Sequence, residues 1–270
     1  MEHVLSLSYG KDSMACLGAI EHLGWPLDRI ETVDVWATQT IPAEYPPVAE
    51  FKARADELIK ERYGITVEHI TLSKLYGISK DKISYEDLFY YVLPAGKYVG
   101  QIKGFPLQRG PWCNHLKTAA TRERDGTPII RYLGIAADEP IRIARQMNDP
   151  SIKLPLVELG WEEDLCGLWC KYNGLLSPTY DTGTRDGCWF CHNQGPSQLR
   201  LLRKNYPHLW DLLLKWDKDS PVPFNSSGRT VHDYDARFEM EDLGLLDPTK
   251  RFFWKSVHEY QKSKGDSNET

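Results

Sequence analysis

Six consecutive residues near the N-terminus have the side chains of a phosphate-binding loop: Ser8, Tyr9, Gly10, Lys11, Asp12 and Ser13. They follow a short apolar run, residues 3–8, that predicts a strand, and they precede a helical pattern at residues 11–23. A glycine permits a tight turn from strand to helix, and the free N–H groups of a first helical turn, aided by the helix dipole, attract anions. The loop therefore predicts an anion site at the start of the first helix.

Side chains of this loop would strengthen the anion site. Ser8 and Ser13 would supply hydroxyl donors, and Lys11 would supply a positive charge for phosphate. Asp12 would cap the helix or approach a metal ion bound to a nucleotide. The spacing differs from GxxxxGK[ST] and from GxGxxG, which disfavours a Walker loop and a dinucleotide-binding fold. The alternative is a helix start without a ligand, because Ser, Asp and Gly are common at helix caps.

The chain has six cysteines, which are Cys16, Cys113, Cys166, Cys170, Cys188 and Cys191. The spacing of Cys188 and Cys191 presents two thiolates to one centre, which indicates a metal site but also suits a redox dithiol. Cys166 and Cys170 lie four residues apart on a predicted helix and so share one face. Cys16 lies on the apolar face of the first helix, where we expect it to pack in the core.

Composition limits the classes of protein to which these motifs could belong. The 270 residues are 41% hydrophobic and 26% charged, which suits a globular chain with one large domain or one domain and an appendage. With 33 basic and 38 acidic residues the net charge is −5, so no global basic field indicates nucleic acid. No run approaches the roughly 18 apolar residues of a membrane span, and the start lacks the pattern of a signal peptide. We expect a cytoplasmic protein without membrane association, in which structural disulfides are rare.

Strand-like and helix-like patterns alternate through the first two thirds of the chain. Strands are expected at residues 3–8, 30–37, 65–71, 129–136 and 153–157. Helices are expected at residues 11–23, 46–64, 114–124, 139–146 and 161–172. Near-continuous apolar strands separated by such helices predict an α/β fold, with an open, mostly parallel sheet and helices on both faces.

Two regions depart from this alternation. Residues 75–108, rich in Tyr, Gly and Lys, are expected to be an insertion, either a substrate-facing lid or an irregular crossover. After residue 177 strand patterns are absent, and short helices are expected at 196–205 and 207–215. The expected domains are an α/β domain with the phosphate loop at 1–175, a mainly helical, cysteine-bearing region at 176–261 and a frayed tail at 262–270.

Four motifs together resemble one family. SxGxDS after an N-terminal strand resembles the PP-loop of the adenine-nucleotide alpha-hydrolase superfamily, which includes ATP pyrophosphatases, tRNA sulfurtransferases and phosphoadenylyl-sulfate (PAPS) reductases. Lys11 within the loop is most like the PAPS reductase branch. RGPWCNHLK at 109–117 is similar to its Arg/Trp-Cys-x-x-x-Lys element, and GIAADEPIRIAR at 134–145 to its Gly-x-Arg-x-x-Glu-Ser-x-x-Arg element. GCWFC at 187–191 resembles a paired-cysteine element of PAPS-reductase-like proteins, and the ordered match covers residues 3–215.

The resemblance implies a HUP-like fold in which ATP or a related adenine nucleotide, with Mg²⁺, lies across the carboxyl ends of the strands. The implied nucleotide contacts are Ser8, Tyr9, Gly10, Lys11, Asp12, Ser13, Asp34, Lys117, Arg142 and Arg145. Of these, Lys11, Asp12 and Ser13 would be catalytic. Asp34 would meet the ribose or the base, or would simply cap the end of its strand. Lys117, Arg142 and Arg145 would be anion clamps that bind the phosphates, because phosphate recognition favours fixed cationic groups.

The resemblance also adds Cys113 to the paired cysteines as a metal or cluster ligand. A tryptophan adjoins Cys113, Cys170 and Cys188, and such an apolar shell suits a thiolate site. None adjoins Cys166, so we select Cys170 as the fourth ligand. The expected site is zinc or a [4Fe-4S] cluster bound by Cys113, Cys170, Cys188 and Cys191. The alternative is that Cys170 packs within its helix and only the CxxC pair binds.

One departure from the family bears on the reaction. Sulfonucleotide reductases use a nucleophilic cysteine on a C-terminal segment, but the last 79 residues contain no cysteine. We therefore expect an enzyme that cleaves ATP at the α-phosphate, adenylates an acceptor and releases pyrophosphate, in a reaction linked to sulfur transfer. The alternatives are a sulfonucleotide reductase that releases sulfite and a non-catalytic nucleotide-binding subunit of a larger assembly. The acceptor is open and includes tRNA and DNA, and a protein partner or a homo-oligomer is open as well.

Overall fold

The computed structural model describes residues 1–106, 112–124, 128–182 and 187–267. The chain forms two compact units, each made of two separate stretches. The first unit joins Met1–Tyr85 to Cys113–Trp189, and the second joins Glu86–Trp112 to Phe190–Thr270. The chain thus passes from the first unit to the second between residues 189 and 190. The sequence pattern predicts the domain boundary near residue 175.

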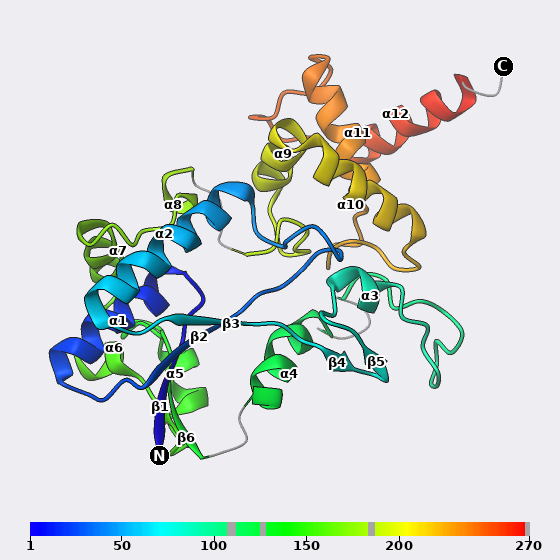
Figure 1. The fold of residues 1–270 in the computed structure, drawn as a ribbon. Helices are drawn as coiled ribbons and strands as arrows, with labels where there is room; N and C mark the ends of the chain where they lie inside the picture. The colour runs from blue at the N-terminus through cyan, green and yellow to red at the C-terminus, as the bar shows by residue number, and fades with distance from the viewer. Residues whose placement is uncertain (107–111, 125–127, 183–186, 268–270) are drawn as a thin grey trace. The chain divides into compact units, whose positions relative to one another are not determined.

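The first unit is built on a five-stranded sheet (Figure 1). Its strands are β1 (Glu2–Ser6), β2 (Arg29–Val33), β3 (Val67–Ile70), β6 (Ile129–Tyr132) and β7 (Ile152–Lys153). They follow the order β3-β2-β1-β6-β7, and every neighbouring pair is parallel. Leu5 on β1 lies opposite Ile30 on β2 and Tyr132 on β6, and all three side chains are fully buried. The predicted α/β fold with a parallel sheet is confirmed.

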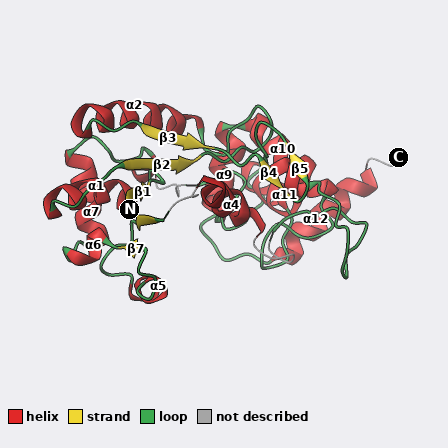
Figure 2. Ribbon diagram, turned by 60° about the horizontal axis from the view of Figure 1, so that its bottom comes forward, coloured by secondary structure: helices red, strands yellow, loops and turns green. Residues whose placement is uncertain are grey.

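Helices lie around this sheet. They are α1 (Lys11–Leu23), α2 (Pro46–Tyr63), α4 (His115–Arg124), α5 (Pro140–Gln146), α6 (Pro155–Glu158), α7 (Glu163–Tyr172) and α8 (Thr179–Thr182). The crossover from β1 through α1 to β2 and the crossover that returns through α4 to β6 run in opposite directions along the sheet. Because such crossovers are right-handed, α1 and α4 lie on opposite sides of the sheet, as Figure 2 shows.

Helix α1 begins and ends where the sequence predicts. Gly24 closes it in the left-handed conformation (φ 63°), and its N–H bonds to the carbonyls at the end of the helix. The helix also packs against α6 and α7. At Gly18 a Cβ atom would come within 2.4 Å of the ring of Trp169 on α7, so only glycine permits this close approach.

Of the strand predicted at residues 153–157, only Lys153 lies in a strand. Strand β7 ends at Lys153, and Pro155 begins helix α6. Proline has no N–H to donate to a sheet and fits the first turn of a helix. Leu156 is therefore buried as part of a short helix against α1 rather than on a strand.

The expected insertion at residues 75–108 divides between the two units. Strands β4 (Lys74–Leu75) and β5 (Ile78–Ser79) form an antiparallel hairpin in the first unit. Helix α3 (Tyr85–Phe89) follows, and from Glu86 onward the chain belongs to the second unit. Its action as a lid stays a prediction.

The second unit is mainly helical, as predicted for the C-terminal part. Its helices are α9 (Pro196–Asn205), α10 (Pro207–Asp219), α11 (Val231–Asp242) and α12 (Trp254–Ser267). The sequence pattern predicts the first two but not the last two, and the expected frayed tail begins inside α12. The rings of Phe89, Phe105, Trp216 and Phe224 pack together in its core. Among the described helices, none has the length and apolar character needed to cross a membrane.

Candidate functional site

The phosphate loop leaves the carboxyl end of β1 and enters α1 at Gly10. Gly10 stands at the N-cap with an extended backbone (φ −72°, ψ 154°) and has no side chain to cap the helix, and the hydroxyl of Tyr180 accepts the N–H of Lys11 at 3.2 Å. The first hydrogen bond within the helix joins Met14 N to the Gly10 carbonyl at 3.0 Å. The N–H groups of Asp12 and Ser13 therefore have no partner within the helix, which is the arrangement that an anion site requires.

Two serine hydroxyls brace the loop. The hydroxyl of Ser13 donates to the carbonyl of Gly10 at 2.9 Å and accepts the N–H of Ser8 at 3.1 Å. The hydroxyl oxygens of Ser8 and Ser13 lie 3.0 Å apart. The start and the end of the loop are thereby tied together, with both hydroxyls at the carboxyl end of β1.

On the β6 side of the loop lies a cavity of about 310 Å³. Its polar lining includes Ser8, Ser13, Arg142 and Arg145, and its floor includes Gly134 after β6. The guanidinium of Arg142 also pairs with the carboxylate of its neighbour Glu139, with both oxygens within 2.7 Å. The structure thus brings two of the expected anion clamps to the same cavity as the loop.

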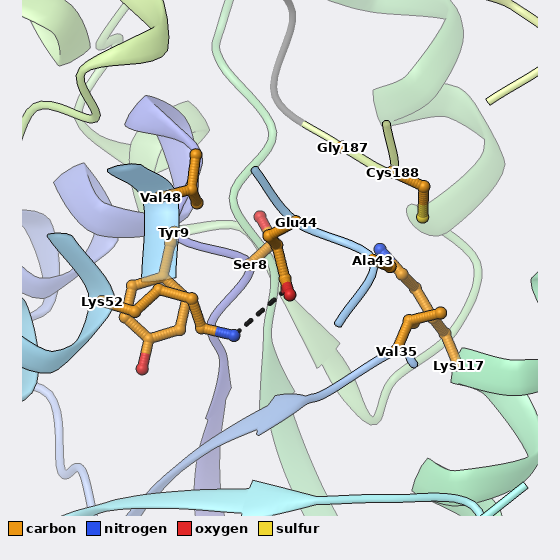
Figure 3. Close-up of a pocket in the computed structure, with 10 residues that line it drawn as sticks. All are labelled: Ser8, Tyr9, Val35, Ala43, Glu44, Val48, Lys52, Lys117, Gly187 and Cys188. Atoms are coloured by element: carbon orange, nitrogen blue, oxygen red, sulfur yellow. Dashed lines mark hydrogen bonds and ion pairs between the residues drawn. The ribbon is translucent and has the colours of Figure 1, made fainter. Parts of the chain in front are cut away.

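On the β2 side lies a second cavity of about 190 Å³, which we call the β2-side cavity. Ser8 lines it too, together with Glu44, Lys52, Lys117 and the end of β2. The ammonium of Lys52 pairs with the carboxylate of Glu44 at 3.2 Å, as Figure 3 shows for the adjoining pocket. Burial alone would lower the pKa of Lys52, but the neighbouring carboxylates raise it, so this lysine is a fixed positive charge. Lys117, on α4, lines the same cavity as Ser8 of the loop, and its binding of an anion stays a prediction.

Lys11 and Asp12 are paired with each other. The ammonium of Lys11 contacts Asp12 at 2.7 Å and Glu163, on α7, at 2.9 Å. Although burial opposes it, the two carboxylates raise the pKa of Lys11 above its ordinary value. Burial raises the pKa of Asp12, and the pairing with Lys11 opposes that shift. The ammonium of Lys11, which we expect at the phosphates, therefore also pairs with a carboxylate of α7 in this structure.

Asp34 already has two partners at the end of β2. Its carboxylate accepts hydrogen bonds from Lys52 at 2.6 Å and from His69, on β3, at 2.9 Å. Although burial opposes it, these partners hold the pKa of Asp34 below its ordinary value. Asp34 lines a third cavity of about 280 Å³, beyond the β2-side cavity, together with Glu44 and Asp56. Contact of Asp34 with a ribose or a base remains a prediction.

Cys188 lines the pocket drawn in Figure 3, together with Ser8 and Lys117. The residue that follows it fixes this position. Trp189 is fully buried, and it donates from its backbone to the carbonyl of Ala43 at 2.9 Å and from its indole to the carbonyl of Pro42 at 3.0 Å. The tryptophan neighbour thus anchors the cysteine segment to the loop that follows β2.

Cys170 lies in the core of the first unit. It is fully buried within the same apolar cluster as Cys16 and Cys166, and its thiol donates to the carbonyl of Lys11 at 3.1 Å. Burial raises the pKa of Cys170 to about 12, which keeps the thiol protonated. In this structure Cys170 is therefore a core residue.

Of the four expected ligands, Cys113, Cys188 and Cys191 are half-buried, whereas Cys170 is fully buried. Cys113 lies in the short helix η2 (Trp112–Asn114), where the chain passes from the second unit back to the first, and Cys191 belongs to the second unit. Within the ranges that the structure describes, no three His, Cys, Asp or Glu side chains gather into a metal site. Arg109, from the same motif as Cys113, lies outside the described residues.

Sequence reasoning missed four polar residues of this region: Glu44, Lys52, Asp56 and His69. Lys52 carries the one signal that could have revealed them. It is buried on the face of α2 formed by Val48, Phe51 and Ala55, where a charged side chain is unusual unless it has partners. Those partners come from other elements, so their identity required the fold.

Comparisons with known proteins place the chain only loosely. No protein-family model matches it, and no curated protein is similar to it. One similar solved structure is the U34-tRNA thiolase NcsA from Methanococcus maripaludis with its [4Fe-4S] cluster, with a TM-score of 0.35 and 13% identity over 93% of this chain and 84% of that chain.

Proposed function

We propose that this chain is a PP-loop enzyme that binds ATP, or a related adenine nucleotide, and cleaves it at the α-phosphate. A nucleophilic atom of the acceptor attacks the α-phosphorus, the bond from that phosphorus to the bridging oxygen breaks, and pyrophosphate leaves. The acceptor becomes adenylated, which activates it for replacement of the adenylated atom by sulfur.

The observation that carries this proposal is the position of the phosphate loop between a basic cavity and a second cavity in which Glu31 and Glu44 balance two lysines. Ser8 lines both cavities, with Arg142 and Arg145 on one side and Lys52 and Lys117 on the other. The chain leaves β1 and β6 in opposite directions at this point, and open α/β sheets bind their ligands at such a switch point. A polyphosphate joined to a nucleoside fits a basic cavity that adjoins one with balanced charges.

Each cavity suits one part of the nucleotide. We assign the pyrophosphate to the 310 Å³ cavity, because arginine forks match phosphate oxygens and the first turn of α1 adds N–H donors. We assign the adenosine to the β2-side cavity and the adjoining pocket of Figure 3, where Val35 and Val48 offer apolar contact beside Glu44. The α-phosphate then falls at Ser8, within reach of Lys117.

The residues of the loop would act by electrostatic stabilisation. Charge develops on the leaving pyrophosphate, and fixed N–H groups and cations aimed at that charge lower the barrier. Lys11 would exchange the carboxylate of Glu163 for a phosphate oxygen when the nucleotide binds. Mg²⁺ would enter as part of the Mg²⁺–ATP substrate. Asp12, the carboxylate of the loop, would approach this ion.

The link to sulfur chemistry rests on the motif resemblance and on Cys188 in the lining of the pocket of Figure 3. We propose that Cys188, Cys191 and Cys113 hold zinc or a [4Fe-4S] cluster and that Cys170 is a core residue. A cluster would supply a site for bound sulfide, and zinc would be structural. For the acceptor we propose a nucleic acid, tRNA or DNA.

Pyrophosphate release tests this function. Purified protein is incubated with Mg²⁺–ATP and either total tRNA or duplex DNA, and pyrophosphate is measured with a coupled assay. We expect release from the wild-type protein and from Lys60→Ala, whose lysine is exposed on α2, but not from Lys11→Ala. Equal release from wild type and Lys11→Ala, or release of orthophosphate instead, would show that the proposal is wrong.

A further inference from the structure

Tyr9, in the middle of the phosphate loop, has a backbone conformation that residues other than glycine rarely adopt. Its φ is 60°, in the left-handed region, and its side chain is 3% exposed. Such conformations persist only where the surroundings hold them. Neighbouring residues must therefore hold Tyr9 in this conformation, and the contacts of its side chain identify them.

The side chain of Tyr9 reaches from the loop to helix α2. Its hydroxyl donates to the carboxylate of Asp56, and its ring packs edge-on against Phe51, with ring centres 6.4 Å apart. The ammonium of Lys52 lies 4.9 Å from the ring centre, close enough for a cation–π contact. Burial, with the hydrogen bond to Asp56, raises the pKa of Tyr9 well above its ordinary range, so the hydroxyl stays a donor.

His69 extends this chain of contacts from α2 to β2. Its Nδ1 lies 2.9 Å from the carboxylate of Asp34, and its Nε2 lies 2.9 Å from the carboxylate of Asp56. Only a doubly protonated imidazole donates from both nitrogens. The two hydrogen bonds raise the pKa of His69 to about 9, in agreement with that geometry.

Lys52 connects the same chain to the β2-side cavity. Its ammonium bridges Asp34 at 2.6 Å and Glu44 at 3.2 Å, and Glu44 lines that cavity. The charged groups around His69 are therefore three carboxylates and one ammonium, together with the neutral phenol of Tyr9. With His69 protonated, the two cations Lys52 and His69 lie among three carboxylates. Attraction between these opposite charges stabilises the group.

We propose that Tyr9, Asp56 and His69 are positioning residues that hold the phosphate loop in its binding conformation and tie it to α2 and β3. They act through the backbone of Ser8 and Gly10 and not through contact with the phosphates. This inference rests on the proposed function for the identity of the ligand, but the fixation of the loop is a property of the protein without a ligand.

Backbone amide exchange measures that property directly. We expect Tyr9→Phe and Asp56→Asn each to speed exchange of the hydrogen-bonded amides of Leu7, Ser8 and Met14 by about tenfold, the effect of losing one hydrogen bond to a charged group. Tyr63→Phe is the matched control, because Tyr63 also bonds a carboxylate, that of Glu21, but at the far end of α2. Unchanged exchange of these three amides for both Tyr9→Phe and Asp56→Asn would overturn the proposal.

A variant that fails to fold would be replaced by a measurement on the wild-type protein. Raising the pH from about 7 to about 10 removes the proton that lets His69 donate twice, so protection of the loop amides, corrected for intrinsic exchange, should fall. Protection that stays constant over this range would contradict the proposal.

Affinity for ATP then separates anchoring from simple relief of strain. Tyr9→Gly adopts the left-handed conformation freely but lacks the side-chain anchor. We expect Tyr9→Gly and Tyr9→Phe both to bind ATP about tenfold more weakly than wild type. Binding as tight as wild type would mean that the position needs only a permissive backbone and would overturn the proposal. If wild type binds no ATP, the proposed function fails while the exchange result still decides this inference.

Discussion

Gly134, at the end of β6, lies so close to Ser13 that a Cβ atom built on the glycine would come within 2.5 Å of the Ser13 backbone N and Cα. The carboxyl end of β6 and the first turn of α1 therefore touch through their main chains. This contact sets the floor of the 310 Å³ cavity, which Gly134 and Ser13 both line. Any side chain at residue 134 must displace the phosphate loop or the strand.

Gly134→Ala should therefore impair both stability and ligand binding. The neighbour is backbone and cannot rotate away, so we expect a loss of about 1–3 kcal/mol in unfolding free energy and weaker ATP binding. Gly167→Ala, within α7, is the control, because its nearest contact would be an ordinary 3.9 Å. That change should stabilise the protein by about 0.5–1 kcal/mol. Urea unfolding and calorimetric titration with ATP check both, and a neutral Gly134→Ala would refute the close contact.

Arg145→Ala should weaken binding of the polyphosphate specifically. The guanidinium lines the cavity that we assign to pyrophosphate, so the Kd for ATP should rise about tenfold while the Kd for AMP stays unchanged. Arg54→Ala, which removes an exposed arginine from α2, serves as the control. Calorimetry with both nucleotides measures the effect. An equal loss for AMP and ATP would place the pyrophosphate elsewhere.

His69 should make stability depend on pH in the alkaline range. The pKa of His69 is about 9 in the folded protein against an ordinary value near 6.5, so folding favours the protonated form. Its stabilisation is complete below about pH 6.5 and is lost as the pH rises through about 9. The side chain is about one third exposed, and solvent screening reduces the contribution to about 1–2 kcal/mol.

Thermal unfolding at several pH values tests this sign. The Tm of the wild-type protein should fall between about pH 6.5 and about pH 9.5 by more than that of His69→Gln, which carries no titrating group. Comparison with the variant removes the effects of the other groups that titrate in this range. Parallel curves for the two proteins would contradict the assignment.

Substitution of single cysteines should distinguish the metal ligands from the cysteine that packs in the core. In anaerobically purified protein we expect Cys188→Ser and Cys191→Ser to lose bound zinc or iron, because a CxxC pair presents two thiolates to one ion. Cys170→Ala should keep the metal and lose only stability, because this thiol is packed in the core and bonded to the Lys11 carbonyl. Metal analysis and absorption spectra distinguish these results. Loss of metal from a folded Cys170→Ala protein would restore Cys170 as a ligand.

Features that depend on local sequence could be predicted. Helix α1 has its expected bounds because Gly10 and Gly24 fix its ends through backbone geometry. The carboxyl end of β1 and the loop after it follow from the same pattern. The sheet order, by contrast, follows only from how the crossovers return across the sheet.

Features that depend on distant partners could not be predicted. Helix α11 carries a buried Asp233 and Arg237 among its apolar residues, which interrupts the apolar stripe that indicates a helix. Asp233 is satisfied by a capping box with Thr230, and Arg237 pairs with Glu241 at 2.9 Å. At the site, Asp34 could be named from its strand, but its engagement by Lys52 and His69 arises only in the fold.

The central claim is that the triphosphate lies along the phosphate loop with its pyrophosphate in the cavity between Gly134 and Arg145. A crystal structure with α,β-methylene-ATP tests it most directly, because this analogue cannot be cleaved between the α- and β-phosphates. We predict the β- and γ-phosphates at the N–H groups of Asp12 and Ser13, with Arg145 in contact. An analogue bound away from this loop, or with its triphosphate directed toward the third cavity at Asp34, would contradict the account.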